Sequence, residues 1–447
     1  MFRIVQMTDL PPTRTRRSVL TGLAAGIVSA ILSPHAIAQA RPKLVLQAKP
    51  AVAQLRPGQK DTPVWSLVTA PDAKIRFRRG DEVEVTFNND LPVPVILNWH
   101  GIGGTPAVEP LTARPPLAPG TKDTFILPLR HAGTMLCDLH VLGDKQLLPS
   151  PACALVVEER EPVAVDRDEV LLIEDWRLRS DGTAVAPGAD SKDTLTIYAA
   201  NGLPSADIST RSNERIRFRF INSCQRNVIA LKIDDHDVRV MAIDSQPSEP
   251  FLARGGQLVL APGTRIDAFI DATRPPGSTS QIHLHDGKKA RPIARLIYSG
   301  EAPVRATPLP PALALPSNGL PSQFDLKNAL RINLALNPSG SPQDWIAPAN
   351  FTLALAAAFR VKRGRTVVLA LTNPAEISAV FHLHGHHFRL LDRLDDGWKP
   401  FWLDTLVIDP QQTQRVAFAA EHAGRWLMEV MAADWAAPRL VRWYSVD

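Results

Sequence analysis

The amino-acid sequence predicts an all-β protein made of three β-sandwich domains. One observation behind this prediction is a pattern of two alternating apolar and polar strands around a charged turn, which recurs three times at intervals of about 140 residues. The other is the proline content, because 40 of the 447 residues are proline, against an average share of about 5%. Proline at this level suits many short strands and turns and argues against a helical bundle.

The repeated pattern assigns one pair of strands to each third of the chain. Its copies lie at residues 74–87, 214–222 and 359–373, and each consists of a strand, a charged turn, a second strand and an Asn near its end. The first copy is typical of a hairpin. A stretch rich in Pro and Ala at 303–321 lacks periodicity and indicates a linker. The predicted organisation is a first domain at 41–160, a second at 161–302, the linker at 303–321, and a third domain at 322–447.

Residues 1–40 have the features of an export signal. Arg16 and Arg17 precede a mild apolar run at 21–32, and small residues of the A-x-A type follow at 36–38. Paired arginines point to the twin-arginine route, which predicts a periplasmic protein. The apolar run is well short of the roughly 20 residues that a membrane-spanning helix needs. We therefore expect no membrane span once the signal is cleaved.

Charge and cysteine content narrow the function classes. The formal charge of +5 comes partly from the arginines of the N-terminal segment. The sequence has no Lys/Arg stripe with interleaved aromatic residues, so nucleic-acid binding is not expected. Three cysteines, Cys137, Cys153 and Cys224, are too few for a disulfide framework. Cys137 and Cys153 could pair in an oxidising compartment, or all three could be small buried apolar side chains.

Histidine motifs in the first and last thirds of the chain resemble those of a known family. The first third contains Asn-Trp-His-Gly at 98–101 and an Ala-Gly-Thr turn at 132–134 that leads to His140. The last third contains His-Leu-His-Gly-His at 382–386. With these motifs the chain resembles the three-cupredoxin, laccase-like multicopper oxidases. The resemblance implies three cupredoxin-like Greek-key β-sandwiches and a metal site between the first and the last.

The resemblance also implies that the electron-entry copper is missing. In the family a type 1 copper is bound by two His and a Cys thiolate, and the C-terminal motif is His-Cys-His with a further His four residues later. The matching residues here are Glu429-Val430-Met431 and Trp435, and the remaining His position is Ala379. Because Val, Trp and Ala cannot ligate copper, we expect neither a type 1 copper nor ordinary laccase activity.

Half of the histidines that hold the family's three-copper cluster are retained. The residues at the eight matching positions are Asn98, His100, Asp138, His140, His382, His384, Glu429 and Met431. His140, His384 and Glu429 match positions that share one copper in the family. Two His and one carboxylate form the ligand set of mononuclear iron sites, and zinc and manganese also bind to this ligand set. The resemblance thus implies one transition metal ion, with copper or iron favoured and zinc or manganese as alternatives. His100 and His382 would be further metal ligands, and Asp138 the catalytic proton donor or acceptor.

Two function classes follow from this cluster. In the first, the protein is a metal-dependent periplasmic oxidoreductase that acts on a small-molecule substrate. Its carboxylates favour this class, because a buried carboxylate without a partner costs several kcal/mol. In the second, the histidines remain in a metal-free polar core because they pack and hydrogen-bond well. The chain would then resemble the copper-free, twin-arginine-exported members of the fold, which act as cell-division scaffolds through a periplasmic protein partner.

Overall fold

The computed structural model describes residues 40–69, 75–142, 148–336, 344–392 and 397–447, and residues 41–447 form one compact unit. The predicted export signal lies outside the described residues. Strands dominate the described part of the chain, which confirms the predicted all-β class. Its only helices are three single 3-10 turns, η1 Pro106–Val108, η2 Arg254–Gly256 and η3 Pro348–Asn350. Among the described residues, no helix has both the length and the apolar character needed to cross a membrane.

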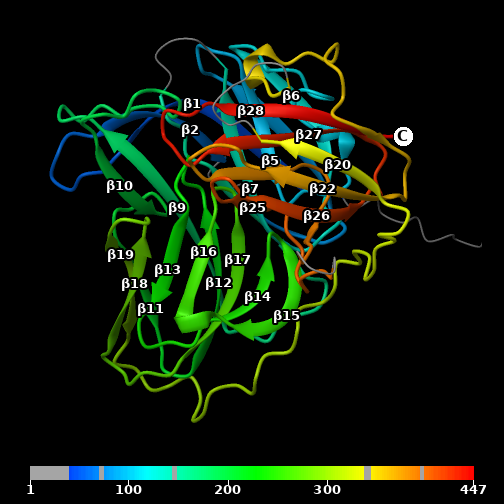
Figure 1. Ribbon diagram of the computed structural model, residues 1–447. Helices are drawn as coiled ribbons and strands as arrows, with labels where there is room; N and C mark the ends of the chain where they lie inside the picture. The colour runs from blue at the N-terminus through cyan, green and yellow to red at the C-terminus, as the bar shows by residue number, and fades with distance from the viewer. Residues whose placement is uncertain (1–39, 70–74, 143–147, 337–343, 393–396) are drawn as a thin grey trace, which may run out of the picture. The chain divides into compact units, whose positions relative to one another are not determined.

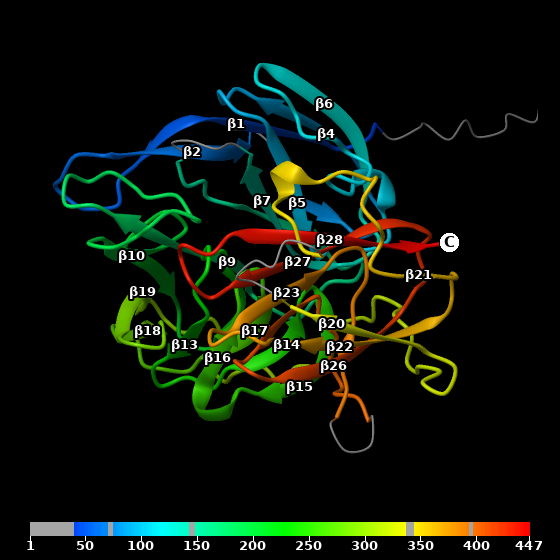
Figure 2. The ribbon, with the colours of Figure 1, turned by 45° about the horizontal axis from the view of Figure 1, so that its top comes forward.

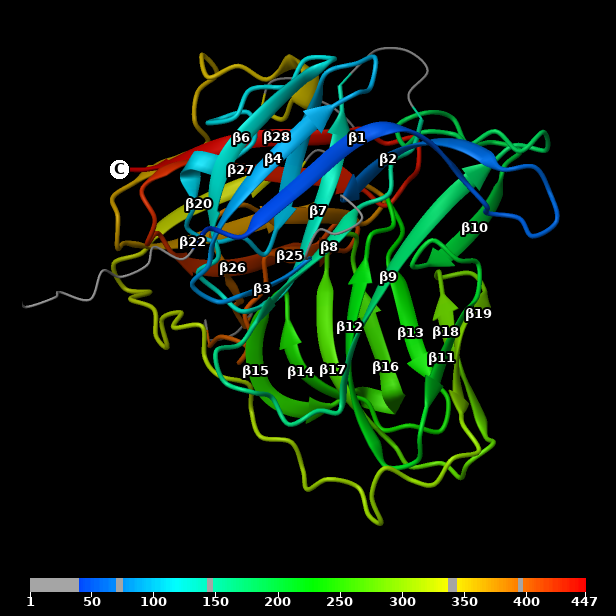
Figure 3. The ribbon, with the colours of Figure 1, turned by 180° about the vertical axis from the view of Figure 1, so that it is seen from behind.

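The first third of the chain forms two four-stranded sheets, with the strand orders β2-β1-β4-β6 and β3-β8-β7-β5 (Figures 1 and 3). In β4 the alternation of residues places Val83, Val85 and Phe87 in the core between these sheets, while polar residues face outward. The bounds are β1 Lys43–Ala53, β2 Thr62–Thr69, β3 Arg76–Arg78, β4 Glu82–Asn89, β5 Val95–His100, β6 Thr121–Pro128, β7 Gly133–Val141 and β8 Cys153–Glu158.

The middle third forms a six-stranded sheet, β10-β9-β12-β17-β14-β15, and a five-stranded sheet, β11-β19-β18-β13-β16. Phe218 and Phe220 of β12 stack in the core of this pair of sheets. The bounds are β9 Arg167–Leu178, β10 Leu195–Ala200, β11 Ala206–Thr210, β12 Glu214–Asn222, β13 Ile229–Ile233, β14 Arg239–Ile243, β15 Gln246–Leu252, β16 Gln257–Leu260, β17 Arg265–Ala272, β18 Thr279–His285 and β19 Ala290–Tyr298.

The last third forms a four-stranded sheet, β20-β22-β26-β24, and a five-stranded sheet, β21-β28-β27-β23-β25. Phe381, Phe418 and Trp426 fill the core of this pair. The bounds are β20 Leu330–Ala335, β21 Arg360–Val361, β22 Thr366–Thr372, β23 Ala379–Leu383, β24 Arg389–Leu390, β25 Thr405–Ile408, β26 Thr413–Ala419, β27 Gly424–Ala432 and β28 Arg439–Val446. The linker predicted at 303–321 contains no strand or helix.

The charged turns of the repeated pattern do not close hairpins, although the repeat itself is present. In the first and last thirds this turn carries the chain from one sheet to the other, from β3 to β4 and from β21 to β22. In the middle third the copy at 214–222 forms the single strand β12, and residues 211–213 connect it to β11 in the other sheet. The first strand of each pair runs parallel to a later strand, which is β8, β19 or β28. The hairpin prediction was wrong because alternation fixes which face of a strand is buried but not which strand it pairs with.

Buried arginines of the middle third join the three pairs of sheets. Arg219 on β12 donates to the hydroxyl of Thr134 on β7 at 2.9 Å and to Asp267 on β17 at 3.1 Å. Arg265 on β17 donates twice to the carboxylate of Asp404, at 2.9 and 2.6 Å. All five side chains are buried. Because a buried charge is costly unless it is paired, these contacts fix the middle sheets against the first and last thirds.

The three cysteines are free thiols. Cys137 on β7 lies directly opposite Cys153 on β8, and both contact the same core. Burial raises the pKa of Cys137 and Cys224 well above the ordinary value. The structure therefore shows the cysteines as mostly buried small side chains, with two of them adjacent.

Candidate functional site

Two pairs of strands position the predicted site residues. β5 pairs with β7, which places Asn98 opposite Asp138, and β23 pairs with β27, which places His382 opposite Glu429. The rings of His100 and His382 are 4.1 Å apart between their centroids, so the two pairs of strands meet there (Figure 2). The cluster therefore lies between the first and last thirds of the chain.

Three of the predicted metal ligands face one another inside this cluster. Glu429 Oε1 lies 3.7 Å from His140 Nδ1 and 3.7 Å from His384 Nε2. None of the three side chains is more than 7% exposed. Within the described part of the chain, none of these three atoms has a hydrogen-bond partner. The structure thus brings together the two His and the carboxylate that the sequence analysis grouped.

Two carboxylates contact the outer nitrogens of these histidines. Glu109, which follows η1, places Oε1 2.8 Å from His384 Nδ1 and accepts the backbone N–H of Leu427 at 3.0 Å. Asp138 Oδ2 lies 3.2 Å from His140 Nε2. Carboxylates in this position fix the orientation and the tautomer of metal-binding histidines. The sequence analysis placed Asp138 beside the site but missed Glu109, which lies outside the histidine motifs.

His100 and His382 extend the cluster on one side. His382 Nδ1 donates to the backbone carbonyl of Asp404 at 3.1 Å, which leaves its Nε2 buried without a described partner. Asn98 Nδ2 donates to His100 Nε2 at 3.3 Å, and Asp138 Oδ1 is 3.5 Å from the same nitrogen. The rings of His382 and His384 are 4.6 Å apart. All six predicted site residues are therefore in one connected group.

Arg439, at the start of β28, is a member of this cluster that the sequence analysis missed. Its Nη1 lies 2.9 Å from Asp138 Oδ2 and 3.6 Å from Glu429 Oε2, and it also contacts His140 Nε2. A guanidinium only donates hydrogen bonds, so the last contact favours the His140 tautomer whose proton is on Nδ1. A metal ion on Nδ1 requires the opposite tautomer, in which Nε2–H donates to Asp138. The Arg439–His140 contact and a metal on His140 therefore exclude each other.

The charges of the cluster shift the pKa values of its members. Burial alone would raise the pKa of Asp138 and of Glu429, but the Arg439 guanidinium and the neighbouring histidines of the cluster hold both pKa values well below their ordinary range. Burial would lower the pKa of His384, but its two neighbouring carboxylates raise it to about 10. Without a metal ion, the Arg439 guanidinium and the His384 imidazolium therefore offset the negative charge of Asp138 and Glu429.

The residues at the matching type 1 copper positions make other contacts. Ala379 and Val430 are fully buried in the apolar core of the last third. Trp435 Nε1 donates to the carbonyl of Ala186 at 3.0 Å. As the side chains stand, no group of three or more His, Cys, Asp or Glu among the described residues is arranged to hold a metal ion.

Three models of one protein family match successive parts of the chain. Each is described as multicopper oxidase, and they cover residues 54–161, 167–280 and 325–447. The chain belongs to the multicopper oxidase family. The three matches follow the three pairs of sheets, so the pairs are the cupredoxin-like sandwiches of a multicopper oxidase.

The relatives of this multicopper oxidase family member include proteins named as oxidases and a protein named for cell division. The multicopper oxidase MmcO of Mycobacterium tuberculosis is 25% identical over 414 residues, covering 80% of this chain and 78% of its own. The cell division protein FtsP of Sodalis glossinidius is 27% identical over 217 residues, covering 45% of this chain and 44% of its own. A solved multi-copper oxidase from Pseudomonas thermotolerans has a TM-score of 0.77 at 24% identity, covering 91% of this chain and all of its own. This last likeness shows the fold.

Proposed function

We propose that this family member is an exported periplasmic protein that lacks a type 1 copper and binds one transition metal ion between its first and last thirds. The main support is the meeting of His140 Nδ1, His384 Nε2 and Glu429 Oε1, all buried and without described hydrogen bonds. Copper, which the family implies, and iron suit this donor set, and zinc or manganese are alternatives. His100 and His382 lie close enough to add ligands.

The family's other coppers do not fit these residues. A type 1 copper requires a Cys thiolate and two His, whereas Ala379 and Val430 are buried in an apolar core. The three cysteines all lie before residue 225, far along the chain from this motif. Four of the eight histidine positions of the three-copper cluster hold Asn, Asp, Glu or Met. The donors that remain support one metal ion and no type 1 copper that would relay electrons to it.

A single ion requires the donors and Arg439 to rearrange. Ligands about 2.1 Å from a tetrahedral ion lie roughly 3.4 Å apart, and Glu429 Oε1 is 3.7 Å from each histidine nitrogen. Side-chain movements of a few tenths of an ångström would close that difference. The ion must also displace the proton from His384 Nε2 and move Arg439 from His140 Nε2, because metal binding requires the free nitrogen lone pairs. Asp138 and Glu109 would then orient the two rings.

Bound there, the ion would supply Lewis-acid or redox chemistry at its open positions. Asp138 would be the proton acceptor or donor for the substrate, because its carboxylate lies beside the cluster. Arg439 would hold that carboxylate in place at 2.9 Å. A small-molecule substrate would have to bring its electrons to the site itself. We therefore propose a metal-dependent oxidoreductase rather than an ordinary laccase.

The second candidate function is that of a metal-free scaffold. The contacts of Arg439 within the cluster favour it. Its guanidinium contacts Asp138, His140 and Glu429 and so supplies the positive charge that a metal ion would bring. The similarity to a protein named for cell division, FtsP, covers 45% of the chain. In this candidate the protein would act through its surface on a periplasmic protein partner.

Elemental analysis of the folded, exported protein distinguishes the two candidates. We expect about one equivalent of a transition metal in the wild type and its loss in the double variant His140→Ala/His384→Ala. The control variant, His283→Ala/His285→Ala, changes two histidines on β18, outside the cluster, and should keep the metal. A wild type that stays metal-free after reconstitution would overturn the metal proposal and support the scaffold. Three or four coppers per chain would contradict both candidates.

A further inference from the structure

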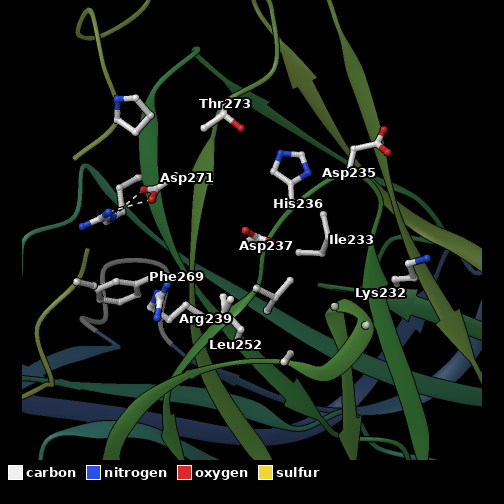
Figure 4. A pocket seen from close by; sticks show the side chains of 17 residues that line it. Lys232, Ile233, Asp235, His236, Asp237, Arg239, Leu252, Phe269, Asp271 and Thr273 are labelled. Atoms are coloured by element: carbon white, nitrogen blue, oxygen red, sulfur yellow. Dashed lines mark hydrogen bonds and ion pairs between the residues drawn. The ribbon is translucent and has the colours of Figure 1, made fainter. Parts of the chain in front are cut away.

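A pocket of about 730 Å³ lies in the middle third, away from the histidine cluster. It is lined by the end of β13, the turn at 234–238, the ends of β15 and β17 and the segment at 308–312 (Figure 4). Its volume is within the range of about 300–1,000 Å³ that is common for small-molecule sites. None of the predicted metal-site residues lines it.

Arg239, at the start of β14, is a charged side chain of this pocket with two apolar cross-strand neighbours. It lies opposite Leu252 of β15 on one side and Phe269 of β17 on the other. Cross-strand partners point to the same face of a sheet, and Figure 4 shows Arg239 beside both apolar side chains. Arg239 is half-buried, and the described residues give its guanidinium no hydrogen bond or ion pair. It is therefore a half-buried cation with no acceptor among the described residues.

Most other charges in the pocket are neutralised. Arg215 donates to both oxygens of Asp271, at 2.7 and 2.9 Å, and Asp235 pairs with an arginine outside the lining. Lys232 is exposed at the mouth of the pocket and has no described ion-pair partner. The carboxylate of Asp237 is also exposed, so water can solvate it. The unpaired groups thus add up to a net positive charge.

His236 is not available for chemistry in the pocket. Its Nδ1 is 2.6 Å from the carbonyl of Asp234 and its Nε2 is 2.6 Å from the hydroxyl of Tyr298. Both ring nitrogens are therefore already bonded within the fold. The pocket combines an unpaired cation with an apolar wall, which indicates a binding site.

We propose that this pocket binds a small organic carboxylate with a flat apolar body. The carboxylate accepts two parallel hydrogen bonds from the Arg239 guanidinium, an arrangement that arginine forms with carboxylates. The apolar body packs against Phe269 and Leu252, and Lys232 attracts the anion to the mouth. Neither the metal nor the scaffold candidate is needed for this site.

The test is calorimetric titration of the full exported protein with benzoate and 2-naphthoate, and with benzyl alcohol as the neutral analogue. We expect the carboxylates to bind and benzyl alcohol not to bind. Arg239→Gln should weaken carboxylate binding at least tenfold, because it removes hydrogen bonds to a charged acceptor. Lys232→Gln should weaken it by a smaller factor. Arg179→Gln and Lys288→Gln, which change exposed residues outside the pocket, should bind as the wild type does.

Several outcomes would overturn the proposal. These are no binding of either carboxylate, equal binding of benzyl alcohol, or unchanged binding in a folded Arg239→Gln variant. If Arg239→Gln does not fold, the exposed Lys232→Gln variant decides, and its unchanged affinity at low salt counts against the site. Metal content should be the same in Arg239→Gln and the wild type, so a failure here is distinguishable from a failure of the metal proposal.

Discussion

Arg439 is a mostly buried cation beside Asp138 and Glu429, and its replacement tests how the charge of these two carboxylates is balanced. In Arg439→Met, Asp138 and Glu429 lose their guanidinium partner. We expect the free energy of unfolding in chelator to fall by about 3–5 kcal/mol, the usual cost of removing one member of a buried pair. Added metal should restore part of this loss, because the ion replaces the missing positive charge. Urea denaturation with chelator and with metal measures both effects.

The exposed Arg179 provides the matched control for this variant. Arg179→Met should change the free energy of unfolding by no more than about 0.5 kcal/mol. Undiminished stability of Arg439→Met in chelator would show that the guanidinium does not neutralise the carboxylates. A large loss that metal leaves unrepaired would favour the metal-free scaffold.

The residues of the candidate site could be predicted only where a motif contains them. The motif positions of His140, His384 and Glu429 indicated that they would meet, and the structure places them together. Glu109 and Arg439 lie outside those motifs, and side chains that arrive from a loop and from another strand leave no local pattern. One signal was available, since two acids in a buried cluster require cations nearby.

At the scale of the elements, the sequence predicted which residues form strands better than how the strands pair. The stretch 214–222 was expected to contain two strands and a turn, but it forms the single strand β12. Its arginines are buried because carboxylates of neighbouring strands pair with them. Such pairs depend on the order of strands in the sheet, and the alternation of residues along a single strand does not predict that order.

Strand β9 carries a buried acid whose titration should be visible in the stability of the protein. Burial raises the pKa of Glu174 to about 8, and its Oε1 has no described hydrogen-bond partner. The folded state therefore holds a proton that the unfolded state releases at its ordinary pKa of 4.5. Stability from this group is fully present below that value and is lost as the pH rises through about 8, at roughly 1.4 kcal/mol per unit.

Glu174→Gln removes this titration while keeping a neutral side chain of similar size. We expect the wild type to lose stability relative to the variant between pH 5 and pH 8, as measured by urea denaturation at several pH values. Glu249→Gln, which changes an exposed acid on β15, should follow the wild type. Parallel curves for wild type and Glu174→Gln would show that Glu174 is ionised in the folded protein.

At the scale of the whole molecule, the candidate site joins the two ends of the described chain. His140 belongs to β7 in the first third, while His384 follows β23 and Glu429 lies on β27 in the last third. The motif resemblance anticipated this meeting. It did not anticipate the support from the middle third, where Arg265 bonds to Asp404 beside β25. That contact depends on how the sandwiches pack together, which no repeated sequence pattern encodes.

A metal ion held at this junction should stabilise the whole fold, because its ligands come from both ends of the chain. Binding to the folded state alone adds about 4 kcal/mol at a thousandfold excess over Kd. Chelation should therefore lower the Tm of the wild type and metal re-addition should restore it. His140→Ala/His384→Ala should show no response to either treatment, while His283→Ala/His285→Ala should respond as the wild type does. If neither chelation nor metal re-addition changes the wild-type Tm, Arg439 and His384 already offset the negative charge of the cluster without a metal ion. The function would then lie at the protein's surface.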